Sequence, residues 1–237
     1  MMIKLVGIGP GDLQYLTFRA KDALEKCDVV IGYEKYVEQI AELIKSKVIY
    51  KYKMGQEEER CKRAVELSNE GKDVCLVCGG DPGIYSLSSI ILDLTDDVEI
   101  IPGISALNAC ASILGSPLSN DFVVLSFSDY NVDISEIKKR VELACKVDFV
   151  MVIYNPISKV RLEKTKEIFQ VIVDNKPAKT KVALVKNCYR ADFSMRIIEL
   201  SQIFENIDFI DMNTTVIVGN KYTYENFGRL ITPRWYK

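Results

Sequence analysis

The stretch VGIGPGDLQYLT, residues 6–17, runs from a short apolar segment through a glycine-rich turn into an amphipathic pattern. A strand, a glycine loop and a helix in this order are typical of α/β proteins that bind a ligand at the carboxyl end of the strand. A dinucleotide-binding loop needs glycine at three places, but Asp12 stands where the third is required, and no Gly-Lys-Ser/Thr follows to make a P-loop. The stretch therefore predicts close backbone approach to a ligand other than a dinucleotide, or a tight turn that Asp12 merely caps.

The composition is that of a globular protein. Of the 237 residues, 48% are hydrophobic and 27% are charged, and the length allows one large domain or two smaller ones. The formal net charge of −2 gives no field that would attract nucleic acid or an anionic membrane surface, so we expect neither as a partner. No apolar run reaches the length of a membrane span and no signal peptide is recognisable, which predicts a cytoplasmic protein.

Two residue types limit the chemistry. The chain has no histidine, which excludes Ser-His-Asp and Cys-His nucleophiles and histidine-based zinc sites. It has seven cysteines, of which Cys75 and Cys78 lie in one predicted strand. Residues three apart in a strand point to opposite faces, so a shared disulfide or metal ion is disfavoured there. We expect no metal ligands from the protein, and any acid–base work must use Asp, Glu, Lys, Tyr, Ser or water.

Apolar runs and helical patterns alternate along the whole chain, interrupted by LGSPLSND at 114–121. The alternation predicts an α/β fold with two domains, 1–116 and 117–237, mostly parallel sheets and an active-site cleft between the domains. Ser135 is the expected N-cap of one helix. Strands are predicted at 2–8, 28–31, 47–50, 73–78, 97–101, 122–127, 148–154, 181–186, 194–200 and 214–219. Helices are predicted near 13–26, 34–45, 57–70, 84–94, after 103, and near 135–146, 159–173 and 200–206.

Three further turns resemble the first in form. CGGDPGIYS at 78–86, IPGISALNA at 101–109 and VIYNPIS at 152–158 each leave the end of a predicted strand. In the first of them, Gly79 and Gly80 would let the backbone approach a ligand, and Asp81 would offer a carboxylate to hydroxyl groups or a cation. Any one of these turns alone is more often structural. Together they place four Gly/Pro turns at the ends of strands.

In this order and over nearly the whole chain, VGIGPGDLQYLT, GGDPGIYS, IPGISALNA, YNP and NTTVIVGN resemble the tetrapyrrole methylases of corrin biosynthesis. Within that family, VVIGYEKYVEQI and ALNACASILGSPLSNDFVVLSFSD are most similar to the precorrin-3B C(17)-methyltransferases. The resemblance implies S-adenosylmethionine (SAM) bound in the cleft, and a homodimer. It also implies methylation at C17 of a tetrapyrrole at the precorrin-3 level that carries many carboxylates, with or without cobalt, coupled to ring contraction in cobalamin biosynthesis.

The resemblance also assigns cofactor contacts to this chain. Tyr33 stands where the uroporphyrinogen-III methylases carry an acidic residue, so the proton-acceptor role of that residue is not transferred, and uroporphyrinogen III is disfavoured as substrate. The expected cofactor contacts are Pro10, Gly79, Gly80, Asp81, Ile84, Ser105, Ala106, Tyr154, Asn187, Thr214 and Thr215.

Methyl transfer from a sulfonium needs orientation and exclusion of water rather than a metal or a histidine. Ring contraction needs acid–base help, for which Ser126, Ser128 and Asp129 are candidates because they end the first strand of the second domain. Glu58 and Asp81 follow, and the alternative for Asp129 is a solvated turn residue. The basic residues that would meet substrate carboxylates, unless they form a salt-bridged helix face, are Lys51, Lys53, Arg60, Lys62 and Arg63.

Two groups of alternatives stay open. Another methylase of the same family would act on precorrin-4 or precorrin-2, and a diphthine synthase would methylate a protein side chain. A ligand-binding module without catalysis would bind SAM but not consume it.

Overall fold

The computed structural model describes residues 2–157 and 161–234, and the chain forms two compact units, Met1–Ala106 and Leu107–Lys237. The division lies after the first residue of helix α5 (Ala106–Leu114), whereas the sequence placed a boundary after residue 116. The reason is that the short strand β6 (Gly115–Ser116), which follows α5, pairs with strand β13 (Arg229–Ile231) near the end of the chain. The long apolar helix required by a membrane span is not found among the described residues.

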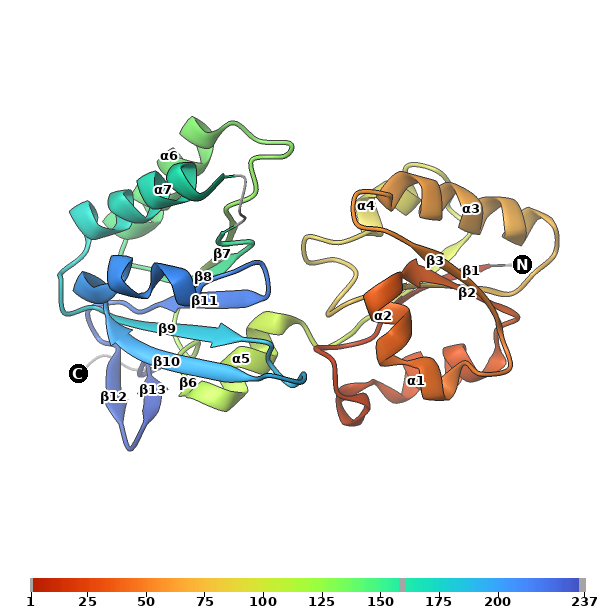
Figure 1. The fold of residues 1–237 in the computed structure, drawn as a ribbon, viewed down its shortest axis with the longest axis horizontal. Coiled ribbons are helices and arrows are strands. Elements are labelled where there is room, and N and C mark those ends of the chain that lie inside the picture. Colours follow the sequence, from red (N-terminus) through yellow and green to blue (C-terminus); the bar gives the residue numbers. More distant parts are fainter. Residues whose placement is uncertain (1, 158–160, 235–237) are drawn as a thin grey trace. The chain divides into compact units, whose positions relative to one another are not determined.

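The N-terminal unit contains one five-stranded sheet in the order β3-β2-β4-β1-β5, and every pair of neighbours is parallel (Figure 1). Each predicted strand of this half is found, because short apolar runs flanked by turn residues are too short for helices. The three central strands are buried on both faces, whereas the two edge strands are partly exposed. Parallel strands leave all their carboxyl ends at one edge of the sheet. The strands are β1 (Ile3–Gly7), β2 (Val29–Tyr33), β3 (Val48–Tyr52), β4 (Val74–Cys78) and β5 (Val98–Ile101).

The helices of this unit are shorter than the sequence predicts. Residues 13–26 form a 3₁₀ turn and a separate helix, because Leu16 and Thr17 are extended and the Thr17 hydroxyl accepts the N–H of Ala20 as an N-cap. Asp12 does act as a cap, but of the 3₁₀ turn, where it accepts the N–H of Gln14. The elements are η1 (Leu13–Tyr15), α1 (Phe18–Lys26), α2 (Glu34–Gln39), η2 (Ala41–Leu43), α3 (Glu57–Asn69) and α4 (Ser88–Leu92).

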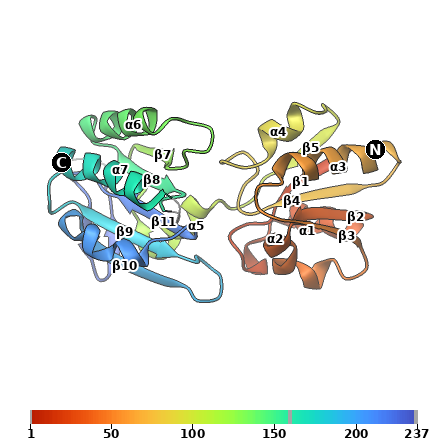
Figure 2. The same ribbon diagram turned by 45° about the horizontal axis from the view of Figure 1, so that its top comes forward.

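Two hydrophobic cores cover the two faces of this sheet. Helices α1 and α2 pack on one face and α3 and α4 on the other, as both views of the ribbon show (Figures 1 and 2). Cys75 belongs to the first core and Cys78 to the second, which confirms that these two residues of β4 point to opposite faces. All seven cysteines are buried free thiols, as expected for small hydrophobic side chains.

The C-terminal unit has a mixed sheet in the order β10-β9-β11-β8-β7. Only β7 and β8 are parallel neighbours, so the expectation of a mostly parallel sheet is wrong for this unit, although five of the eight neighbouring pairs in the two five-stranded sheets are parallel. Helices connect β7 to β8 and β8 to β9, but a short loop turns β9 back into β10, which forces antiparallel pairing. The strands are β7 (Phe122–Ser126), β8 (Val150–Tyr154), β9 (Lys181–Lys186), β10 (Ser194–Glu199) and β11 (Thr214–Val218).

Helices α6 (Ile134–Lys146) and α7 (Leu162–Asn175) lie side by side over this sheet (Figures 1 and 2). The predicted start of α7 at residues 159 and 160 lies outside the described residues. Asp133, not Ser135, caps α6, because its carboxylate accepts the backbone N–H of Ser135 at 2.8 Å. The predicted helix near 200–206 is 3₁₀ in form, as η4 (Leu200–Gln202) and η5 (Phe204–Phe209), and a hairpin of β12 (Tyr224–Asn226) and β13 was not predicted.

Candidate functional site

Three loops meet at the carboxyl edge of the N-terminal sheet. They follow β4, β1 and β5, which are neighbours in the sheet, so their loops start side by side. Beyond the strand ends, Gly9 and Gly80 form an isolated bridge: the Gly80 N–H donates to the Gly9 carbonyl at 2.8 Å, and the Gly9 N–H donates back at 3.2 Å. The glycine loop that opens the chain is therefore joined directly to the GGDPG loop.

Glycine is required where these loops cross. A Cβ on Gly103 would lie 2.1 Å from the carbonyl oxygen of Gly80, and a Cβ on Gly7 would lie 2.7 Å from the same oxygen. Gly79 packs against the ring of Tyr36, where a Cβ would come within 2.6 Å. The sequence predicted that Gly79 and Gly80 let the backbone approach a ligand. In the structure, the space beside Gly79 is filled by Tyr36, and the backbone of Ser105 is nearest to Gly80.

Asp81 holds two of the loops together. One carboxylate oxygen accepts the N–H of Gly83 at 2.8 Å within its own turn, and the other accepts the N–H of Gly103 at 3.1 Å in the next loop. We expected this carboxylate to be offered to ligand hydroxyl groups or a cation. In the structure both of its oxygens accept backbone N–H groups, which gives Asp81 a clear role in positioning the edge.

Ser105 has a hydroxyl that lacks a partner. The residue is 2% exposed, and its Oγ makes no hydrogen bond with any part of the chain that the structure describes. It stands one residue before α5, in the loop after β5. The other expected cofactor contacts of this unit belong to the same three loops: Pro10 is buried, while Ile84 and Ala106 are half-buried. A buried hydroxyl without a partner is costly, and a bound ligand would remove that cost.

The C-terminal unit gathers its predicted residues at one edge of its own sheet. The register pairs Ser126 with Tyr154 at the ends of β7 and β8, and Thr214 with the last residue of β9, which precedes Asn187. Thr215, the residue after Thr214 on β11, is opposite Val185 of β9 and is buried. This edge combines the carboxyl ends of three strands with the start of a fourth strand that runs the other way.

Most of these side chains have partners within the unit. The Tyr154 hydroxyl accepts the N–H of Leu107 at 2.8 Å, near the start of α5. Thr214 exchanges hydrogen bonds with Asp211, whose backbone N–H donates to its hydroxyl at 3.0 Å. Asn187 has φ of 52°, a left-handed backbone that asparagine tolerates, and directly follows β9.

The Ser126 hydroxyl accepts two hydrogen bonds and keeps its O–H available as a donor. Its Oγ accepts from the side-chain amide of Asn155 at 3.0 Å and from the N–H of Ser128 at 3.2 Å. A hydroxyl has two lone pairs and one proton, so two accepted bonds leave the O–H as a donor. Asn155 was not proposed as a functional residue, although the YNP turn that contains it was noted.

Asp129 is an ion-paired carboxylate. Lys164 lies 2.7 Å from one of its oxygens and the Arg161 guanidinium lies 4.0 Å from the other. The hydrogen bond from Lys164 lowers the pKa of Asp129 below its usual value, against a smaller effect of burial. Arg161 also donates to the carbonyls of Asn155, at 2.8 Å, and of Phe127. No sequence signal pointed to Arg161, because its role depends on a long-range contact.

Glu58, the third predicted catalytic residue, lies in the N-terminal unit. It is in the first turn of α3, 73% exposed, and its carboxylate pairs with Lys62 at 3.4 Å. Of the basic residues expected to meet substrate carboxylates, Lys51 pairs with Glu38 at 3.7 Å and Arg63 with Glu66 at 2.9 Å. The salt-bridged alternative thus describes much of this group. Within residues 2–157 and 161–234, no cluster of three His, Cys, Asp or Glu side chains suits a metal ion.

Comparison with known proteins finds the same family in sequence and in structure. A sequence model of the Tetrapyrrole (Corrin/Porphyrin) Methylases matches residues 2–203. A probable cobalt-factor III C(17)-methyltransferase of Methanothermobacter thermautotrophicus is 39% identical over 99% of this chain and 67% of its own length. A protein of the same description from Salmonella typhimurium is 36% identical over 99% of both chains.

Among solved structures, the methyltransferase CobJ superposes with a TM-score of 0.92 at 27% identity, covering 98% of this chain and 99% of its own. The family model spans most of the chain, and relatives above 30% identity cover nearly all of it. The chain therefore belongs to the tetrapyrrole (corrin/porphyrin) methylase family.

Proposed function

We propose that this protein methylates C17 of a cobalt-loaded tetrapyrrole at the precorrin-3 level, with SAM as methyl donor, in cobalamin biosynthesis. Membership of the methylase family supports the class of reaction. The relatives at 39% and 36% identity are described as acting on cobalt-factor III at C17, which supports both the ring position and a substrate that already holds cobalt.

The observation that carries the cofactor proposal is the buried, unpartnered Oγ of Ser105 among the three glycine loops. Bound SAM would supply an electrophilic methyl group, so no base is needed to activate the donor. The residues of this unit that would hold it are Pro10, Gly79, Gly80, Asp81, Ile84, Ser105 and Ala106. Ser105 would donate or accept a hydrogen bond, while the backbone around Gly79 and Gly80 would contact the ligand directly.

The loops would contribute orientation more than chemistry. Asp81 fixes the GGDPG loop to Gly103, so the edge is organised before a ligand binds. A preorganised surface lowers the entropic cost of aligning the two reactants, which is a large part of the barrier to a bimolecular transfer. A site without histidine is compatible with this reaction.

For ring contraction, the C-terminal unit offers a donor and an anion. The free O–H of Ser126 can donate to an oxygen of the substrate, because its two accepted bonds hold the oxygen in place. Asp129 is ionised at neutral pH like an ordinary aspartate, and the hydrogen bond from Lys164 lowers its pKa further. We therefore propose that Asp129 acts as an acceptor or a weak base and not as a proton donor. Glu58 remains a prediction without supporting contacts.

Three further expectations are carried as parts of the proposal. Tyr154, Asn187, Thr214 and Thr215 are proposed as additional cofactor contacts, supported by their position at one edge of the C-terminal sheet. A homodimer is proposed from the family resemblance, and light scattering of the purified protein tests it. A cytoplasmic location is proposed from the composition, and cell fractionation tests it.

The deciding experiment is turnover under anaerobic conditions with methyl-labelled SAM and cobalt-factor III. We expect transfer of one labelled methyl group and a changed absorption spectrum, with the label at C17 by NMR. Parallel reactions with metal-free precorrin-3B, and with precorrin-2 and precorrin-4 level substrates, test the choice of substrate. Binding of S-adenosylhomocysteine without transfer to any of them would contradict the proposed reaction and favour a ligand-binding module.

A further inference from the structure

Arg60 is a buried cation with most of its hydrogen-bonding capacity unused. It lies in the first turn of α3 and is 4% exposed. One nitrogen, Nη2, donates to the carboxylate of Glu57 at 3.0 Å. The other two nitrogens, Nε and Nη1, are buried and have no partner within the described part of the chain. A guanidinium carries five N–H donors, so three of them are left without an acceptor.

This arrangement does not benefit the fold. Burying a charge is costly unless it is paired and its remaining donors are satisfied, and Glu57 satisfies only one side of the guanidinium. Replacement of a poorly satisfied buried ion by an apolar side chain of similar volume is often neutral or stabilising. The cost is recovered only if a second acceptor arrives from outside the chain.

The position of Arg60 connects it to the carboxyl edge of the sheet. Four residues separate the end of β3 from the start of α3, and β3 is parallel to its neighbour β2, so the first turn of α3 lies at the same edge as the three loops. Cys61, the residue after Arg60 in α3, packs in the same hydrophobic core as Cys78, the last residue of β4, where the GGDPG loop begins. In agreement with this placement, the positive charge of Arg60 acts to lower the pKa of the Cys78 thiol, against the larger opposite effect of burial.

We propose that Arg60 binds a carboxylate of a ligand seated on the carboxyl edge of the N-terminal sheet. The inference rests on the proposed function, which supplies two carboxylate-bearing ligands: the tetrapyrrole, through its acidic side chains, and SAM, through its amino-acid end. A carboxylate is favoured because it provides both a counter-charge and several lone pairs, which the three unused N–H groups require. The exposed Lys51 and Lys62 and the half-buried Arg63 already have carboxylate partners within the chain.

The test compares Arg60→Met with Arg140→Met, which makes the same change at a 54% exposed arginine that pairs with Glu136 on α6. Arg60→Gln is a second variant in case the first fails to fold. Three ligands are titrated against each protein by calorimetry or absorbance: cobalt-factor III, S-adenosylhomocysteine, and methylthioadenosine, which lacks the carboxylate. Thermal unfolding without ligand is measured in parallel.

We expect Arg60→Met to keep its melting temperature within a few degrees and to bind one carboxylate ligand about 10- to 100-fold more weakly. Loss of cobalt-factor III affinity alone assigns the carboxylate to the substrate. Loss of S-adenosylhomocysteine affinity with unchanged methylthioadenosine affinity assigns it to the cofactor. Unchanged affinity for all three ligands, or a large loss of stability with normal binding, overturns the inference. If the wild-type protein binds neither cobalt-factor III nor S-adenosylhomocysteine, the proposed function itself fails.

Discussion

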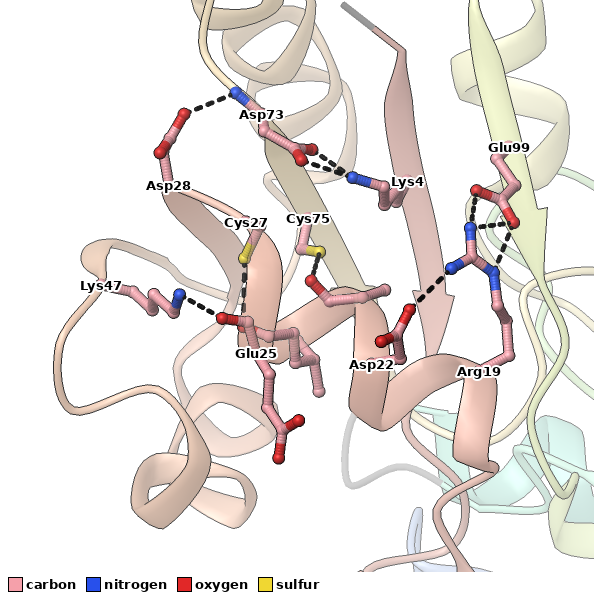
Figure 3. A network of polar contacts seen from close by, with 12 residues as sticks. Lys4, Arg19, Asp22, Glu25, Cys27, Asp28, Lys47, Asp73, Cys75 and Glu99 are labelled. Carbon is pink, nitrogen blue, oxygen red and sulfur yellow. Dashed lines mark hydrogen bonds and ion pairs between the residues drawn. The ribbon is translucent and has the colours of Figure 1, made fainter.

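The two edges of the N-terminal sheet are built in opposite ways. At the amino edge, side chains are paired with one another and with the backbone, as Figure 3 shows for Lys4, Asp28 and Asp73. At the carboxyl edge, three glycine-bearing loops meet through their backbones, and two buried polar side chains keep unused hydrogen-bonding groups. Both edges belong to the same five strands, so the difference comes from the residues that follow or precede them.

The amino edge is a closed network. The Lys4 ammonium bridges both carboxylate oxygens of Asp73, one of them at 2.6 Å. The Asp28 carboxylate accepts the N–H of Asp73 at 2.9 Å, and the Asp28 carbonyl accepts the N–H of Val48 at 3.1 Å. Nearby, Lys47 donates to the carbonyl of Glu25 at 2.6 Å (Figure 3). These contacts tie the starts of β1, β2, β3 and β4 together and leave little for a ligand to bind.

The carboxyl edge has buried polar groups without hydrogen-bond partners among the described residues. Its loops are held by Asp81 and by the bridge between Gly9 and Gly80, but the Ser105 hydroxyl and two nitrogens of Arg60 are not satisfied. Such groups are expensive to bury, and they are found where a site is organised for a partner that comes and goes. We therefore propose that contacts serving stability and groups serving ligand binding are divided between the two ends of the same strands.

The largest expected effect comes from crowding the loops of the carboxyl edge. Gly103→Ala places a Cβ 2.1 Å from the Gly80 carbonyl, so the loops must separate. We expect a loss of about 3 kcal/mol in the free energy of unfolding and at least a 100-fold loss of S-adenosylhomocysteine affinity. Gly55→Ala is the control, because nothing lies within 4 Å of the new Cβ, so any cost there comes from its positive φ of 87° and not from crowding. Equal effects in the two variants would contradict the assignment of the Gly103→Ala loss to crowding between the loops.

The second largest effect is expected from removing the ion pair between Lys4 and Asp73 at the amino edge. Lys4→Met removes the counter-charge of Asp73 in a partly buried pair, 15% and 29% exposed, and we expect a loss of about 2 kcal/mol in the free energy of unfolding. Affinity for S-adenosylhomocysteine should be unchanged. Lys45→Met, which disrupts a fully exposed pair with Glu42, should cost less than about 1 kcal/mol. A fall in ligand affinity in Lys4→Met would contradict the division between the edges.

A smaller effect is expected from removing the unpartnered Ser105 hydroxyl at the carboxyl edge. Ser105→Ala removes a hydroxyl that has no partner in the chain, so unfolding should need the same or slightly more free energy, while S-adenosylhomocysteine binds about tenfold more weakly. Ser89→Ala, on the exposed side of α4, should change neither quantity. Isothermal calorimetry and chemical denaturation measure the affinity and the stability. A loss of stability with normal affinity would mean that the hydroxyl serves the fold, which contradicts our assignment.

The smallest expected effect concerns the ion pair between Asp129, in the loop after β7, and Lys164, which resembles the paired side chains of the amino edge. Asp129 has a lowered pKa in the folded protein, so its pairing with Lys164 stabilises the fold fully above the unfolded value of about 3.9. That contribution, below about 1 kcal/mol, disappears as the pH falls through the lower folded pKa. In Lys164→Met, the pKa of Asp129 should rise, as NMR titration of its carboxyl carbon would show. An unchanged pKa would contradict the assigned pairing.

Much of the fold was predictable because local signals decide it. Short apolar runs and glycine turns located every strand of the N-terminal sheet, and the spacing of Cys75 and Cys78 placed them on opposite faces. Helix ends were less predictable, because Thr17 and Asp133 compete with other polar residues as caps. The family resemblance followed from the order of the turns, which is a property of the chain and not of its packing.

Tertiary structure decided what those residues do. The sequence placed Asp81 beside a ligand, but only the sheet order β4-β1-β5 brings its carboxylate, in the loop after β4, to the N–H of Gly103 in the loop after β5. Five basic residues were candidates by sequence, and only the fold buries Arg60 while Lys62 stays exposed to solvent. Burial, long-range hydrogen bonds and strand direction depend on residues far apart in the chain, whereas periodicity and turn chemistry depend on neighbours.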